Sequence, residues 1–378
     1  MSIWQDSLEV TCTWDLGKRC NLDCSYCPPH RHDLISPHAQ LDLLKRAALL
    51  PLTYSKSLNK VAPGKVKVNV SFTGGEPTLN PNFISIVDYL RSQDDLLTLG
   101  VTTNGLFSES KCQELIEKMD YVTLSYHCEA SKEQKTVIKE NIKRLNKAQK
   151  NKESYLKSFN INLMVHAYED YFLECCQLAE DFKENEITFT ARYIGEHPND
   201  KGAHVYNENQ LNFFKNSWTS EKGSKSCKDN QNQAKEKTTG TNIGRPCCGG
   251  RSFKVLPSDF EFESIDTSES KSLVTERNFK GWYCLVNLFF IHIHQDEEKI
   301  YYHQTCQAKH GNERGPIGTF SDIEKIADDL HSSIMNKTIE PVVCPNKLCN
   351  CGLCITKSPD KKVVDLFLKH NFYGENKR

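Results

Sequence analysis

Three cysteines lie close together near the start of the chain. Cys20, Cys24 and Cys27, in the stretch RCNLDCSYCPP, are separated by three and then two residues. Thiolates bind zinc and iron–sulfur clusters, and short spacings let several of them reach one metal centre. Two uses stay open on spacing alone. One is a [4Fe–4S] cluster held by three thiolates, with the fourth iron left for a ligand; the other is a zinc site completed by His30 or His32.

A second group of cysteines lies toward the C-terminus. Cys284 and Cys306 flank a segment with the pattern of a β-hairpin that turns at QDEEK, and the loop CPNKLCNCGLC follows it. Thiols from a hairpin and a following loop can converge on one iron–sulfur cluster, although the spacing also permits a zinc ribbon. The candidate ligands are Cys284, Cys306, Cys344, Cys349, Cys351 and Cys354. The adjacent Cys247 and Cys248 supply either further ligands or a thiol that acts on the substrate.

The composition favours metal ligation over disulfides. The chain of 378 residues has 17 cysteines but no N-terminal signal pattern, and the cytosol keeps thiols reduced. No stretch reaches the roughly 20 apolar residues that span a bilayer. The net charge of −1 excludes the chain-wide basic field typical of nucleic-acid binding. We therefore expect a cytoplasmic protein with no membrane or evident nucleic-acid partner.

The first half of the chain alternates strand-like and helix-like segments, which is typical of an α/β barrel. Six candidate strands each carry one apolar and one polar row of side chains, as in KVKVNVSF and YVTLSYH. Parallel strands covered on both faces would be apolar on both sides. The pattern thus predicts helices outside and a hydrated cavity inside, as in a partial (β/α)6 TIM-like barrel. His127 and His166 point into this cavity.

Composition divides the chain into four parts. Residues 1–198 form the predicted barrel, and residues 199–250 form a polar insertion or linker that contains CCGGR. Residues 251–358 form a small cysteine-rich domain that holds the second metal centre. Residues 359–378 form a C-terminal helix and tail.

The order of motifs along the barrel resembles that of the radical S-adenosylmethionine (SAM) superfamily. The C-x3-C-x2-C loop, with Tyr26 before its last cysteine, follows the first strand, FTGGEP ends the second strand, and TTNG ends the third. The resemblance covers roughly residues 8–195. It implies that an open iron of a [4Fe–4S] cluster binds SAM, and that electron transfer cleaves SAM to methionine and a 5′-deoxyadenosyl radical.

The resemblance also implies roles for single residues. The cofactor-binding set comprises Tyr26, Gly74, Gly75, Glu76, Pro77, Thr103, Asn104, Ser125 and Arg192. In the family the GGE motif contacts the methionine amino group, and Ser125 matches a position that often binds ribose or carboxylate. Arg192 suits bidentate recognition of the methionine carboxylate. Ser125, His127 and Arg192 are the candidate catalytic residues; the alternative is that such side chains only line a hydrated cavity.

The C-terminal cysteines resemble the SPASM or Twitch extensions of this superfamily, which hold at least one auxiliary [4Fe–4S] cluster. The SPASM spacing C-x2-C-x5-C-x3-C is not matched here, which favours one auxiliary cluster over two. The leading hypothesis is a maturase that modifies a peptide or protein, with flavodoxin or ferredoxin as reductant. One alternative applies the same chemistry to a small metabolite such as an amino acid, sugar or nucleoside. Another is a zinc-stabilised binding module without catalysis.

Overall fold

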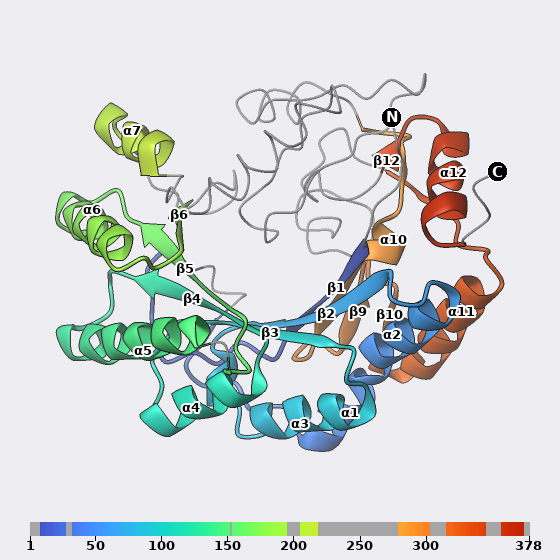
Figure 1. Ribbon diagram of the computed structural model, residues 1–378, viewed down its shortest axis with the longest axis horizontal. Coiled ribbons are helices and arrows are strands. Elements are labelled where there is room, and N and C mark those ends of the chain that lie inside the picture. Colours follow the sequence, from blue (N-terminus) through green and yellow to red (C-terminus); the bar gives the residue numbers. More distant parts are fainter. Residues whose placement is uncertain are drawn as a thin grey trace.

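The computed structural model describes residues 8–27, 32–151, 153–194, 205–217, 279–302, 315–344 and 357–373. Six parallel strands pair in chain order, each with the next. They are β1 Leu8–Asp15, β2 Val66–Thr73, β3 Thr98–Thr103, β4 Tyr121–His127, β5 Ser158–Val165 and β6 Phe189–Tyr193. The sheet curves without closing (Figure 1). The predicted partial barrel is confirmed.

Helices connect the strands and lie along the outside of the curved sheet (Figure 1). They are α1 Leu41–Ala47, α2 Leu49–Val61, α3 Phe83–Gln93, α4 Glu109–Lys118, α5 Lys132–Lys150 and α6 Glu169–Glu184, with α7 Glu208–Ser217 after β6. Capping side chains fix where α4 and α5 begin. Ser108 accepts a hydrogen bond from the Lys111 amide, and Ser131 and Gln134 form a reciprocal capping box. Such caps satisfy amides that have no partner within the helix.

The strands bury one face and leave the other partly accessible. Along β4, Val122, Leu124 and Tyr126 are buried, while Ser125 and His127 between them are half-buried. On β6, Arg192 is half-buried next to the buried Ala191. Successive strand residues point to opposite faces, so the apolar row packs under the helices and the polar row lines the inside.

The sheet continues past β1, which the sequence did not predict. Strand β8 (Phe290–His294) pairs in parallel with β1, and β9 (Lys299–Tyr301) and β10 (Gly318–Thr319) follow in antiparallel order. Within the described residues the sheet therefore has nine strands, in the order β10-β9-β8-β1-β2-β3-β4-β5-β6. All of β8 is buried, as expected of a strand enclosed between neighbours.

The predicted C-terminal hairpin is thus present as β8 and β9, with its turn at residues 295–298, but it belongs to the barrel sheet. Cys284 does not lie on β8, the first strand of the hairpin, because the short helix α10 (Val286–Phe289) stands between Cys284 and β8. Cys306 lies outside the described residues.

A small second sheet holds the remaining C-terminal strands. Strand β7 (Tyr283–Cys284) lies between β11 (Val342–Val343) and β12 (Lys357–Ser358), both antiparallel to it. Two helices accompany this region, α11 (Ile323–Met335), which packs on α2, and α12 (Lys361–Asn371). No helix in the described parts of the chain is long and apolar enough to cross a membrane.

Candidate functional site

The loop with Cys20, Cys24 and Cys27 leaves the carboxyl end of β1, and main-chain hydrogen bonds fix both of its ends. The Cys20 amide donates to the Asp33 carbonyl over 2.8 Å, and the Asp33 amide donates to the Lys18 carbonyl over 2.9 Å. Within the loop, the Cys27 amide donates to the Cys24 carbonyl over 3.0 Å. The three thiols therefore belong to one short, closed loop at the end of the sheet where barrel enzymes carry their active sites.

The surroundings of the sulfur atoms fit an iron–sulfur cluster. The Leu22 amide and the Asn104 side-chain amide lie 3.5 and 3.7 Å from the Cys20 sulfur, and such N–H donors stabilise charged sulfur. Burial raises the pKa of Cys20 and raises the pKa of Cys24 to about 12. Thiolates at these positions therefore need a nearby positive charge, which iron supplies.

The glycines of FTGGEP pack directly against the cysteine loop. The Gly75 amide donates to the Gly17 carbonyl over 2.7 Å, and the Glu76 amide donates to the Arg19 carbonyl over 2.8 Å. A Cβ on Gly75 would lie 2.3 Å from the carbonyl oxygens of Lys18 and Arg19. Gly74 has a φ of +127°. The two glycines are thus required by the close approach of β2 to the cysteine loop.

We expect Gly75→Ala to displace the cysteine loop. Because the added methyl group meets backbone rather than a flexible side chain, the free energy of unfolding should fall by about 1–3 kcal/mol. Iron bound per chain after anaerobic reconstitution should fall with it. Gly315→Ala is the matched control, because a Cβ there meets no atom within 4 Å. Equal iron content and equal thermal midpoints for the two variants would contradict the proposed packing role.

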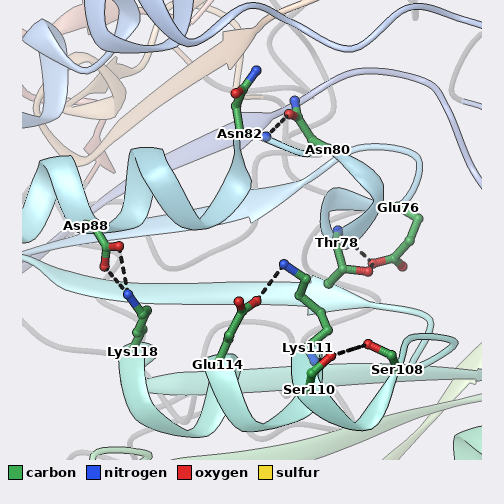
Figure 2. A network of polar contacts seen from close by, with 10 residues as sticks. All are labelled: Glu76, Thr78, Asn80, Asn82, Asp88, Ser108, Ser110, Lys111, Glu114 and Lys118. Carbon is green, nitrogen blue, oxygen red and sulfur yellow. Dashed lines mark hydrogen bonds and ion pairs between the residues drawn. The ribbon is translucent and has the colours of Figure 1, made fainter.

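The carboxylate of Glu76 is buried and bound by the protein's own donors. Its Oε1 accepts hydrogen bonds from the Thr78 amide and hydroxyl and from the Thr103 hydroxyl, over 3.0, 2.6 and 2.8 Å. Its Oε2 accepts one from the Asn104 amide over 2.7 Å. Figure 2 shows Glu76 turned toward Thr78 at the start of the short helix η1 (Pro77–Leu79). Glu76 therefore ties the end of β2 to the end of β3.

Three further residues of GGEP and TTNG are also buried. Pro77, Thr103 and Asn104 are buried, and the Asn104 amide group donates to the Asn21 side-chain oxygen over 2.7 Å. The structure thus brings GGEP and TTNG together around the cysteine loop. Their roles toward SAM stay predictions.

Tyr26 and His127 form a pair beside the cysteines. The Tyr26 hydroxyl lies 2.5 Å from His127 Nδ1, and the two rings are stacked with centroids 5.9 Å apart. Burial raises the pKa of Tyr26 and lowers the pKa of His127 to about 4. Near neutral pH the imidazole is therefore uncharged and the phenol protonated. His127, predicted to face the cavity, here positions the aromatic residue of the cysteine motif.

Glu129 holds the cysteine loop from the end of β4, and sequence reasoning missed it. Its two carboxylate oxygens accept hydrogen bonds from the Ser25 amide and hydroxyl, over 2.6 and 2.5 Å. His166 Nε2 lies 3.0 Å from Oε1, and the Tyr168 amide donates to His166 Nδ1. Nε2 of the neutral ring thus carries the proton given to Glu129. The sequence offers one signal for Glu129, its place two residues after the carboxyl end of β4, where barrel enzymes carry functional residues.

Burial alone would raise the pKa of Glu129, but the hydrogen bonds from Ser25 and His166 outweigh burial and lower it. The carboxylate link is therefore complete above the ordinary carboxyl pKa and is lost only as pH falls through the lowered value.

We expect Glu129→Ala to release the Ser25 amide at neutral pH. A hydrogen bond to a charged acceptor contributes about 1.5–3 kcal/mol, so amide hydrogen exchange at Ser25 should accelerate about 10- to 100-fold. Exchange followed by mass spectrometry measures this change. Glu133→Ala, which removes an exposed carboxylate of the next helix, should leave exchange in the cysteine loop unchanged. Unchanged exchange in Glu129→Ala would refute the link.

The polar inner row places two further predicted residues, Ser125 on β4 and Arg192 on β6, on the two sides of β5. Ser125 on β4 lies opposite Asn162 on β5, and Met164 lies opposite Arg192 on β6. The Arg192 Nε donates to the Asn162 side-chain oxygen over 3.1 Å. Asn162, which sequence reasoning missed, thus orients the guanidinium. The proposed roles of Ser125 and Arg192 in binding SAM remain predictions.

Two of the six candidate auxiliary ligands lie in the described residues, and the small sheet brings them together. Cys284 pairs with Val342, and the Cys344 amide donates to the Trp282 carbonyl over 2.7 Å. Residues two apart on a strand share a face, so Cys284 and Cys344 occupy diagonal positions on one face. Cys306, Cys349, Cys351 and Cys354 lie outside the described residues, as do Cys247 and Cys248.

The described residues thus form an open α/β barrel with a three-cysteine loop after its first strand. Residues 14–178 match the Radical SAM superfamily. This match implies a [4Fe–4S] cluster and SAM as cofactors.

Comparison with known proteins gives local sequence similarity. Molybdenum cofactor biosynthesis protein 1 of Bos taurus is 38% identical over 91 residues, which cover 24% of this chain and 13% of that protein. GTP 3′,8-cyclase of Chlorobaculum tepidum is 31% identical over 107 residues, 28% of this chain and 29% of that protein. The matched part of the chain thus spans less than a third of these relatives.

Among solved structures, Streptococcus suis SuiB matches with a TM-score of 0.47 and 16% identity, over 87% of this chain and 68% of that one. SuiB bound to its precursor peptide SuiA gives a TM-score of 0.48 at 15% identity, over 87% and 67%.

Proposed function

We propose that this chain binds a [4Fe–4S] cluster through Cys20, Cys24 and Cys27 and uses SAM to abstract a hydrogen atom from a carbon of a peptide or protein. When bound, these cofactors supply a 5′-deoxyadenosyl radical, formed as one electron breaks the C–S bond of SAM and releases methionine. The observation that carries the proposal is the cysteine loop, which is fixed against GGEP by two main-chain hydrogen bonds and held by Glu129 at Ser25.

The chain's own residues position and shield the reaction. Gly75 and the Glu76 amide hold the cysteine loop, and Tyr26 and His127 cover one side of it. Ser125 and Arg192 line the inner face where SAM would lie, and a guanidinium suits its carboxylate. Cys284 and Cys344 would contribute to an auxiliary cluster, completed by cysteines of the loop after β11.

Two observations favour a large substrate. The described strands form an open sheet, and an open barrel suits a substrate too large for a closed one. The polar segment 199–250 has a composition suited to a surface loop that contacts a substrate. A small metabolite is the second candidate, and it is favoured by the similarity to GTP 3′,8-cyclase, whose name gives a nucleotide as its substrate.

The experiment uses anaerobically reconstituted full-length protein with dithionite and SAM. Formation of 5′-deoxyadenosine tests the radical chemistry, and its absence from iron-loaded protein would refute that part. GTP and any short peptide encoded beside the gene are then supplied separately. A mass change in a peptide supports the peptide proposal, whereas consumption of GTP with a matching yield of 5′-deoxyadenosine overturns it in favour of a nucleotide substrate.

A further inference from the structure

A third set of candidate metal-binding side chains, which contains no cysteine, lies where β1 meets β8. Asp15 is the last residue of β1, and His292 and His294 lie on β8. The register places Asp15 opposite His294 and Thr13 opposite His292. The three side chains share one face of the sheet, because alternate strand residues point the same way. It is the inner face, since the intervening Trp14 and Ile293 are both in the core.

The three ligand atoms converge on one point. Asp15 Oδ2 lies 3.0 Å from His292 Nε2 and 3.3 Å from His294 Nδ1, and all three atoms lie within 4.8 Å of one another. Around a metal ion with bonds of about 2.1 Å, neighbouring ligand atoms in octahedral or tetrahedral geometry stand roughly 3.0–3.4 Å apart. The two distances to Asp15 already match the edges of such a polyhedron.

The cluster is buried and held by the sheet. His292 and His294 are 1% and 7% exposed, and their rings stack with centroids 4.1 Å apart. The Gln295 amide donates to the Asp15 carbonyl over 3.0 Å, and Trp14 Nε1 donates to the Gln295 side chain over 3.0 Å. Both bonds join Gln295 to the end of β1 and hold β8 beside β1 next to the cluster. Ligands on a rigid scaffold lose little freedom when a metal ion binds.

We infer that Asp15, His292 and His294 bind a single divalent first-row transition-metal ion, distinct from the iron–sulfur clusters. Two imidazoles and one carboxylate form a donor set that suits Zn²⁺ or Fe²⁺ and leaves coordination positions open. Both imidazoles approach the same carboxylate oxygen, an arrangement that one shared cation satisfies.

The coordination positions that the three protein ligands leave open give the metal ion a function in the cavity. The site lies at the carboxyl ends of β1 and β8, the same edge from which the cysteine loop departs. Lys18 of that loop forms an ion pair with Asp296 of the β8–β9 turn at 2.9 Å. The ion therefore offers a binding position for an oxygen-bearing group of a ligand on the same inner face. Binding of the metal does not depend on the radical reaction, so each can fail alone.

Zinc binding to the iron-loaded full-length protein tests the inference. Chelator-washed protein is incubated anaerobically with about 100 μM ZnCl₂, passed through a desalting column, and analysed for zinc and iron per chain. We expect wild type to retain one zinc more than Asp15→Asn or His292→Gln, at equal iron content. Zinc K-edge absorption should show that this zinc has nitrogen and oxygen neighbours at about 2.0–2.1 Å rather than sulfur at about 2.3 Å. His331→Gln on α11 is the matched control and should retain the zinc.

The thermal midpoint with and without zinc tests the inference even if a variant folds poorly. Zinc should raise the thermal midpoint of wild type by several degrees and leave that of Asp15→Asn, which keeps the shape of the side chain, unchanged. Equal zinc retention by wild type and both variants, a zinc shell of sulfur only, or no retained zinc in iron-loaded wild type would each overturn the inference. A lowered midpoint in the variants without any zinc effect would mean that the three residues form only a structural hydrogen-bonded group.

Discussion

Replacing Cys20, Cys24 and Cys27 together by alanine is expected to remove about four iron atoms per chain and to reduce 5′-deoxyadenosine formation to the level of a protein-free mixture. The effect should be complete because the three thiols stand on one loop of eight residues, 20–27, fixed at β1, β2 and β4. No other cysteine in the described part of the barrel lies on that loop. Burial raises the pKa of Cys20 and Cys24, so iron must displace their protons when the cluster binds.

The measurement is iron and sulfide content together with SAM cleavage, on protein reconstituted under one protocol. Cys176→Ala is the matched control, because it removes a half-buried thiol from α6 and should keep both properties. The iron content per chain that remains in the triple variant gives the number of iron atoms in the auxiliary cluster. An unchanged iron content in the triple variant, or a loss of zinc instead of iron, would exclude the proposed cluster.

The barrel strands could be predicted because their information is local. Alternation along YVTLSYH specifies which side chains are buried, and Ser108 and Ser131 mark helix starts through bonds to residues three positions away. The cysteine loop was equally accessible, since its three ligands lie within eight residues. Periodicity and capping act over one or two turns, and the sequence displays them directly.

What could not be predicted depends on contacts between distant segments. The hydrogen bond between Trp14 and Gln295 joins residues 281 positions apart, and only this pairing of β8 with β1 brings His292 to Asp15. A parallel pairing needs no tight turn, so no short motif announces it. For the same reason the sequence predicted the β8–β9 hairpin but did not predict that this hairpin joins the barrel sheet. Glu129 was missed because its partner, Ser25, lies 104 positions earlier.

Glu76 shows a different limit of sequence reasoning. The resemblance gives the GGE motif a contact with the methionine amino group, and it does not say that the Glu76 side chain is buried against Thr78, Thr103 and Asn104. A glycine-rich turn has no periodicity that would specify where the next side chain points. Burial of the carboxylate raises the pKa of Glu76 despite these hydrogen bonds. The side chain therefore has a structural role that is independent of any role its main chain has toward SAM.

Glu76→Ala should accordingly be among the most destabilising single substitutions in the barrel. It leaves the buried amides of Thr78 and Asn104 without an acceptor, and each such loss costs about 1–3 kcal/mol, whereas the two hydroxyls can rotate toward other acceptors. We expect the free energy of unfolding to fall by about 3 kcal/mol or more, measured by anaerobic denaturant unfolding. Glu117→Ala, at an exposed position of α4, should stay within about 0.5 kcal/mol of wild type.

Glu76→Gln separates the hydrogen bonds from the charge. A glutamine keeps the oxygen that accepts three of the four bonds and turns an amide group toward the Asn104 amide, so its effect should be smaller than that of alanine. A carboxyl group whose pKa is raised by folding stabilises the protein most at low pH and less as pH rises above the ordinary carboxyl pKa of about 4.3. The difference in stability between wild type and Glu76→Gln should therefore shrink as pH rises from about 5 toward 8. A difference that grows over this range would contradict this expectation. It would show that the four hydrogen bonds favour the charged carboxylate more than burial disfavours it, so that folding lowers the pKa of Glu76.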